Sequence, residues 1–162
     1  MAPKKNQHKK KPNGKGKDNV SADFGYEGDD VEVAITDEET ASDLKVRGNE
    51  AVKKSEHAIA VKLFTVAIER GPPKEELHLY HSNRSVCALS LKRFAMAISD
   101  AEECVALKPD WSKGFSRLGA AHFYAGNLAA SVKAYASGLA LEPTNSTITE
   151  GLAAAQAALA KK

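Results

Sequence analysis

One pattern of small residues, aromatic residues and prolines occurs three times in this chain of 162 residues. The three copies have identical internal spacing, and they begin 37 and then 34 residues apart. The matching positions are Gly48, Ala60, Phe64, Ala67 and Pro72 in the first copy, Ser85, Ala97, Ala101, Cys104 and Pro109 in the second, and Gly119, Ser131, Tyr135, Gly138 and Pro143 in the third. A period of this length is typical of repeat proteins, in which each copy packs against its neighbours.

The repeated region has the hydrophobic period of helices, and it lacks the apolar–polar alternation of strands. Glycines and prolines separate the periodic segments, because glycine often ends a helix and proline cannot continue one. We therefore expect seven helices, over residues 44–54, 56–70, 75–91, 94–107, 111–124, 128–141 and 147–160. Ser42 and Asp43 are the expected caps of the first. The sequence predicts an all-α fold of three helical hairpins and a final helix.

The first 40 residues have a different composition. Residues 1–17 carry seven lysines and no acidic residue, whereas residues 18–43 carry ten acidic residues and no lysine or arginine. With so few aliphatic residues, burial cannot offset the entropy of ordering, so we expect residues 1–40 to be a disordered tail. The lysine clusters have two interpretations: a nuclear address or weak polyanion contact, and a solubilising segment balanced by the acidic stretch.

Several classes of protein are not supported by the sequence. The amino terminus lacks the apolar core of a secretory signal, and no apolar run reaches the roughly 18–20 residues that span a bilayer. Cys87 and Cys104 fit no metal spacing and suit a reducing compartment. His78 and His81 share a helix without a third ligand, so we expect no metal and no cofactor. No pair of side chains has the arrangement of a nucleophile and base or of an acid and base, so we do not expect an enzyme.

Five polar residues are expected on the first helices of the hairpins, which line the concave face when such hairpins stack. They are Lys45, Asn49, Asn83, Lys113 and Arg117. Residues four apart share one helix face. Three basic groups with no acid among them leave uncompensated positive charge, and asparagine amides add directional donors. This predicts a site for a carboxylate, with a solvated charged surface as the alternative.

Three apolar residues face the same groove in this helical phasing. They are Val52, Val86 and Ala120. For each of them two roles stay open: contact with an aliphatic side chain of a ligand, and packing in the core.

The chain resembles the tetratricopeptide repeat family over residues 42–143, with residues 144–160 as the capping helix. This implies a right-handed superhelix of three repeats in a domain of residues 41–162. Within these repeats, residues 44–49, 82–85 and 107–117 are similar to the dicarboxylate-clamp repeats of heat-shock co-chaperones. The greatest similarity is to the amino-terminal module of the stress-inducible Hsp-organising protein family.

The resemblance implies a cytoplasmic adaptor that binds protein, with no small-molecule substrate and no membrane partner. Its five clamp residues, named above, would hold the Glu-Glu-Val-Asp carboxyl terminus of heat-shock-70 or heat-shock-90 chaperones, without deciding between the two classes. With one module, we expect the chain not to bridge two chaperones by itself. The alternative is a repeat scaffold for another acidic partner, whose lysine-rich tail contacts RNA, the ribosome or the nuclear import machinery and adds a nuclear location.

Overall fold

The computed structural model describes residues 31–162, and these residues form seven α-helices and no β-strand. The helices are α1 (Ala41–Lys53), α2 (His57–Glu69), α3 (Leu77–Ser90), α4 (Phe94–Leu107), α5 (Ser112–Tyr124), α6 (Leu128–Leu141) and α7 (Ser146–Ala160). The all-α prediction is confirmed, and each expected helix is present with its ends within three residues of the expected position. The disorder expected for residues 1–30 lies outside the described residues.

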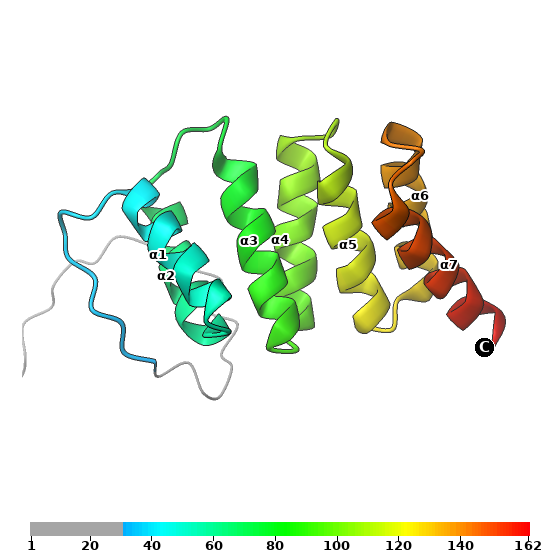
Figure 1. Ribbon diagram of the computed structural model, residues 1–162, viewed down its shortest axis with the longest axis horizontal. Helices are drawn as coiled ribbons and strands as arrows, with labels where there is room; N and C mark the ends of the chain where they lie inside the picture. Colours follow the sequence, from blue (N-terminus) through cyan, green and yellow to red (C-terminus); the bar gives the residue numbers. More distant parts are fainter. Residues whose placement is uncertain (1–30) are drawn as a thin grey trace, which may run out of the picture.

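The helices form an elongated array of two layers (Figure 1). Helices α1, α3, α5 and α7 lie in one layer, and α2, α4 and α6 lie behind them. Each helix contacts the next one along the chain, and α3 also contacts both α1 and α5. The first helices of the three hairpins are therefore neighbours on one face. Within residues 31–162, no helix has both the length and the apolar character needed to cross a bilayer.

The repeated small residue packs against the repeated aromatic residue. A Cβ atom at Gly119 would lie 2.7 Å from ring atoms of Tyr135, and the glycine of the first copy meets its phenylalanine ring in the same way at 2.8 Å. In the second copy Ala101 replaces the aromatic residue, and buried Ser85 replaces the glycine. The hydroxyl of Ser85 donates to the carbonyl of Ala97 at 2.7 Å. The two substitutions compensate each other, because the space left by the missing ring accommodates a serine side chain in place of glycine.

The first helix begins with a capping box. Thr40 is the N-cap: its backbone N–H donates to Asp43 Oδ2 at 2.9 Å, and the backbone N–H of Asp43 donates to Thr40 Oγ1 at 3.2 Å. The expectation that Ser42 or Asp43 caps the helix is wrong, because Asp43 is instead the reciprocal partner of a threonine three residues earlier. The Thr40 hydroxyl also donates to Asp43 Oδ2 at 2.6 Å, and this bond, together with the one from the Thr40 backbone, holds the pKa of Asp43 below its ordinary value of 3.8.

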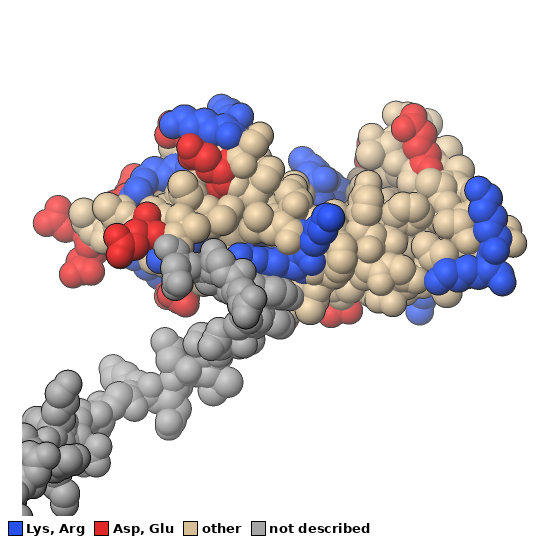
Figure 2. All heavy atoms as spheres, turned by 90° about the horizontal axis from the view of Figure 1, so that it is seen from below, with Lys and Arg blue, Asp and Glu red and all other residues tan. Residues whose placement is uncertain are grey.

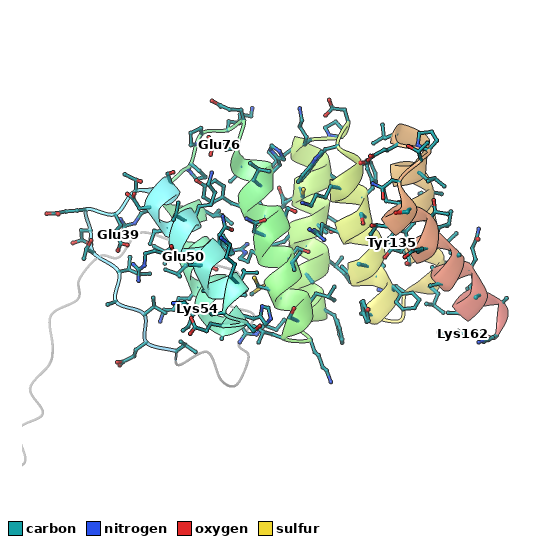
Figure 3. All side chains as sticks on the ribbon, viewed as in Figure 1. Glu39, Glu50, Lys54, Glu76, Tyr135 and Lys162 are labelled. Atoms are coloured by element: carbon teal, nitrogen blue, oxygen red, sulfur yellow. The ribbon has the colours of Figure 1, made fainter. Side chains whose placement is uncertain are left out.

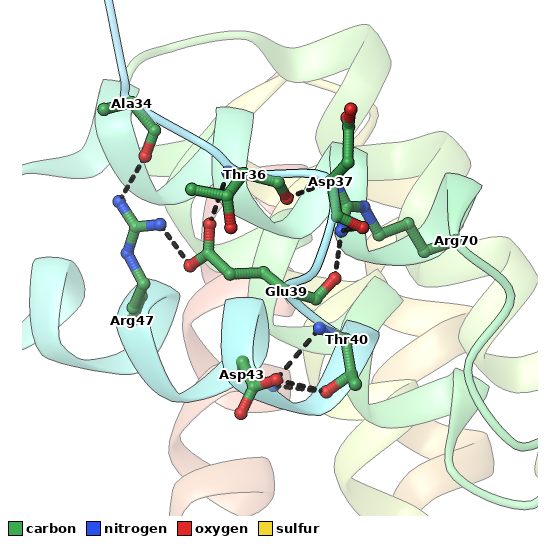
Figure 4. Close-up of polar contacts among 8 residues, drawn as sticks. All are labelled: Ala34, Thr36, Asp37, Glu39, Thr40, Asp43, Arg47 and Arg70. Carbon is green, nitrogen blue, oxygen red and sulfur yellow. Dashed lines mark hydrogen bonds and ion pairs between the residues drawn. The ribbon is translucent and has the colours of Figure 1, made fainter.

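Residues 31–40, which we call the N-terminal strap, lie against the first hairpin. Val33 and Ile35 pack against the core formed with α1 and α2. Arg47 of α1 forms an ion pair with a glutamate of the strap, and Arg70, which directly follows α2, donates to three strap carbonyls (Figure 4). The tail boundary expected at residue 40 therefore differs from the structure, because the strap is held by Arg47 and by Arg70, which lies 31 to 34 residues from its strap partners.

Candidate functional site

The five polar residues lie on three neighbouring helices of the front layer. Lys45 and Asn49 are on α1, Asn83 is on α3, and Lys113 and Arg117 are on α5. Because α3 contacts both α1 and α5, these residues belong to one continuous face. Figure 2 shows the outline of the molecule dipping between its two ends, with lysine or arginine atoms in the dip.

The two asparagines contact each other across the first two repeats. Asn83 Nδ2 donates a hydrogen bond to Asn49 Oδ1 at 3.0 Å, although 34 residues separate them in the sequence. No other hydrogen bond within residues 31–162 involves the amide nitrogen of Asn49. The pair therefore fixes one amide orientation and leaves the Asn49 N–H groups without a partner among residues 31–162.

Lys45 is paired with a carboxylate of the protein itself. Its Nζ lies 2.7 Å from Glu76 Oε2 and 5.0 Å from the centroid of the Tyr80 ring. The hydrogen bond that Lys45 donates to Glu76 is the largest cause that raises the pKa of Lys45 above 10.5, so the ammonium stays charged at neutral pH. Sequence reasoning missed Glu76; the available signal was an acidic pair at the start of the expected third helix.

Lys113 lies at the other side of the group and is exposed. Its Nζ is 5.9 Å from the centroid of the Trp111 ring. Trp111 in turn packs edge-to-face on His78, with ring centroids 5.0 Å apart. This aromatic pair connects the start of α5 to α3 and supports the segment from which Lys113 projects. Sequence reasoning did not assign it a role.

Arg117 is partly buried, and its Nε is fully buried without a hydrogen-bond partner among residues 31–162. Burial lowers the pKa of Arg117, which shows that the surroundings disfavour its charge. A guanidinium has five N–H donors and no acceptor, and Arg117 forms no hydrogen bond or ion pair within residues 31–162. An unmade hydrogen bond of a buried group costs roughly 1–3 kcal/mol. Arg117 is thus a partly buried cation without a carboxylate partner within residues 31–162.

A second arginine shows the contrast. Arg84 donates to Asp100 from Nε at 2.8 Å and from a terminal nitrogen at 2.7 Å, and it also donates to Thr65 at 3.1 Å. His81 Nδ1 lies 2.8 Å from the same carboxylate. This cluster connects α2, α3 and α4. The donors of Arg84 are thus paired within the fold, whereas the Nε of Arg117 is not.

The structure offers little for metal or thiol chemistry within residues 31–162. No three histidine, cysteine, aspartate or glutamate side chains there are close enough to hold a metal ion. Cys87 and Cys104 are buried and unpaired, and burial raises the pKa of each thiol to about 11. Both therefore remain protonated, poorly nucleophilic thiols at neutral pH.

The three apolar candidates are half-buried. Val52 packs against the core of the first hairpin, and Ala120 packs against the core around Tyr135. Core packing thus accounts for much of both side chains. Contact of Val52, Val86 or Ala120 with a ligand stays a prediction.

Comparison with curated proteins finds relatives among chaperone-associated proteins, although no protein-family model matches the chain. The heat shock protein STI1 of Saccharomyces cerevisiae is 43% identical over 113 residues, which is 70% of this chain and 19% of the relative. The Hsp70-Hsp90 organizing protein of Triticum aestivum is 43% identical over 120 residues, which is 74% of this chain and 20% of the relative. The chain thus spans about a fifth of the length of these relatives.

Comparison with solved structures finds repeat domains of similar length. The first TPR domain of Spaghetti (RPAP3), bound to the HSP90 peptide SRMEEVD, has a TM-score of 0.69 and 34% identity, covering 75% of this chain and 94% of that one. The second TPR domain of human RPAP3, in complex with the HSP70 peptide SGPTIEEVD, has a TM-score of 0.66 and 26% identity, covering 72% and 94%. In both structures the repeat domain is bound to a peptide that ends in Glu-Glu-Val-Asp.

Proposed function

Because the chain belongs to the tetratricopeptide repeat family of co-chaperones, with Hsp70-Hsp90 organizing proteins among its relatives, we propose that it is a cytoplasmic adaptor for heat-shock chaperones. Its ligand is the acidic carboxyl terminus of a heat-shock-70 or heat-shock-90 chaperone. Its role is binding rather than catalysis, and it needs no cofactor. Residues 41–162 form the binding domain.

The observation that carries this proposal is the state of Arg117. Its Nε is buried without an acceptor, and it lies four residues from the exposed ammonium of Lys113 on the same helix. Two cations at this spacing share a helix face and repel each other unless an anion lies between or beside them. A ligand carboxylate accepts from the terminal N–H groups of the guanidinium, because Nε itself is enclosed, and it offsets the repulsion. A structural role would instead resemble that of Arg84, which is fully paired.

Each proposed clamp residue contributes a different interaction. Lys113 and Lys45 supply compact charges, whereas Arg117 supplies a rigid fork of donors. The asparagine pair supplies N–H donors without charge, so it selects the position of the ligand oxygens. A terminal aspartate carries two carboxylates, one on its side chain and one at the chain end. Three cations and two amides therefore suit it better than an internal acidic residue with a single carboxylate.

The test is calorimetric titration of the chain with a peptide ending in Glu-Glu-Val-Asp. Charge-assisted hydrogen bonds contribute about 1.5–3 kcal/mol, so Lys113→Ala should weaken binding about 10- to 150-fold. Amidation of the terminal carboxylate should have a similar effect. Lys133→Ala is the matched control, because Lys133 is an equally exposed lysine on α6 in the other layer. Equal affinity of Lys113→Ala and the parent chain would refute the assignment of the clamp.

A second candidate function is a scaffold for another acidic partner, with the lysine-rich residues 1–17 contacting a polyanion and adding a nuclear location. Removal of residues 1–30 separates the two while keeping the N-terminal strap. Peptide affinity should persist in the shortened chain, and any binding to RNA should disappear. A loss of peptide affinity on this truncation would contradict the placement of the site within residues 41–162.

A further inference from the structure

One of the proposed clamp cations is already occupied by an acidic residue of the same chain. Lys45 Nζ and Glu76 Oε2 are 2.7 Å apart. Figure 3 shows Glu76 in the connection that rises above α1 and leads into α3. The two residues are 31 positions apart in the sequence, so the contact depends on the packing of the first and second repeats.

This contact affects the groove because an ammonium group is a compact single charge. A lysine has three donors and can bond to two carboxylates, but two carboxylates at one ammonium repel each other. A ligand carboxylate at Lys45 must therefore displace Glu76 or bind beside a negative charge. Both routes weaken binding. Arg117 has no such competitor, since its buried Nε lacks a partner among residues 31–162.

We propose that Glu76 is a built-in competitor carboxylate, which holds Lys45 in the ligand-free groove and limits the affinity of the clamp for acidic carboxyl termini. This inference rests on the proposed function, because it assigns regulation to the same groove. Its consequence is that the ligand is anchored mainly at Lys113 and Arg117. The Lys45 side then adjusts the affinity.

The backbone holds Glu76 in place while leaving its side chain removable. Glu76 directly precedes α3, and its backbone N–H donates to the carbonyl of Pro73 at 2.9 Å. The repeat copies are three residues farther apart here than at the next junction, and the connection that contains Pro73 accommodates this difference. The side chain of Glu76 is 43% exposed, against 21% for Lys45. Rotation of the carboxylate into water therefore breaks few other contacts.

The expected size of the effect follows from this exposure. Ion pairs between partly exposed side chains are weak, and loss of such a competitor corresponds to a change of about two- to fivefold in a dissociation constant. The effect should shrink as salt is added, because salt screens exposed charges over about 8–10 Å. The pKa of Lys45, raised chiefly by Glu76, is consistent with a pair that is formed in the absence of ligand.

The experiment measures binding of a Glu-Glu-Val-Asp peptide to Glu76→Gln and to Glu75→Gln in low salt. Glu75 is the matched control, because it is exposed, adjacent and loses the same charge, yet it pairs with no group within residues 31–162. Glu76→Gln should bind about two- to fivefold more tightly than the parent chain, and Glu75→Gln should change the affinity less. In a Lys45→Ala background, Glu76→Gln should have no more effect than Glu75→Gln.

The outcomes separate the two proposals. If the parent chain binds the peptide but Glu76→Gln binds equally or more weakly, Glu76 orients Lys45 instead of competing, and this inference is wrong while the proposed function stands. The same follows if the gain survives unchanged in the Lys45→Ala background. If the parent chain does not bind the peptide at all, the proposed function fails and takes this inference with it.

Discussion

Replacement of Arg117 by methionine should make the protein more stable and less able to bind its ligand. The guanidinium is partly buried, its Nε has no acceptor within residues 31–162, and burial lowers its pKa. Arg117→Met removes the unsatisfied donors and the charge but keeps a long flexible side chain of comparable reach. It also removes the repulsion between Arg117 and Lys113, which is four residues away on the same helix face.

The magnitude follows from the burial. An unsatisfied buried polar group costs roughly 1–3 kcal/mol, and Arg117 is only partly enclosed, so the lower part of this range applies. We therefore expect the free energy of unfolding to rise by about 1 kcal/mol. For a domain of this size, that corresponds to an increase in Tm of about 2–6 °C. Peptide affinity should fall at least tenfold in the same variant, because charge-assisted hydrogen bonds are lost.

The assay is urea and thermal unfolding followed by circular dichroism, with peptide titration on the same preparation. Lys113→Met is the matched control: it removes a cation of the same proposed site from an exposed position and should change stability by no more than about 0.5 kcal/mol. It should nevertheless lose affinity. A destabilised Arg117→Met variant would show that the guanidinium supports the fold, and it would refute the view of Arg117 as a cation maintained for a ligand.

Two further predictions concern stability. One turn position has a positive φ in all three repeats, at Ser55 (φ 61°), Lys92 (φ 58°) and Gly126 (φ 83°). Ser55→Gly and Lys92→Gly should each raise the free energy of unfolding by about 0.5–1 kcal/mol in urea titrations, whereas Gly126→Ala should lower it. Unchanged urea midpoints would contradict this account. Hydrogen bonds lower the pKa values of three carboxyl groups below their ordinary values, from 4.5 for Glu39, 3.8 for Asp43 and 4.5 for Glu142. As the pH falls, the unfolded chain therefore binds protons before the folded chain does. The contribution of these groups to the free energy of unfolding is present above about pH 4.5 and should be lost progressively below it. Tm measured from pH 6 to pH 3 should therefore decrease, and Asp43→Asn should reduce the slope; an unaltered slope would show that this capping box does not contribute.

The sequence by itself determined the helical repeat. Small and aromatic residues recur at fixed spacing because each copy must solve the same packing problem, as Gly119 and Tyr135 do. The helical hydrophobic period and the glycines and prolines that end helices sufficed to place seven helices within three residues of their observed ends. The helical phase also placed Asn49 and Asn83 on adjacent first helices, and their hydrogen bond agrees with that placement.

The tertiary structure alone decided how charges are partnered. Nothing local distinguishes Arg84 from Arg117, yet one is bound to Asp100 and the other has a buried Nε without an acceptor. Nothing local connects Lys45 with Glu76, or the N-terminal strap with Arg70. Helical period is a property of consecutive residues, so it can be read from the chain. Ion pairing and burial depend on which distant segments meet and on how much water remains between them, and these are set only when the repeats pack.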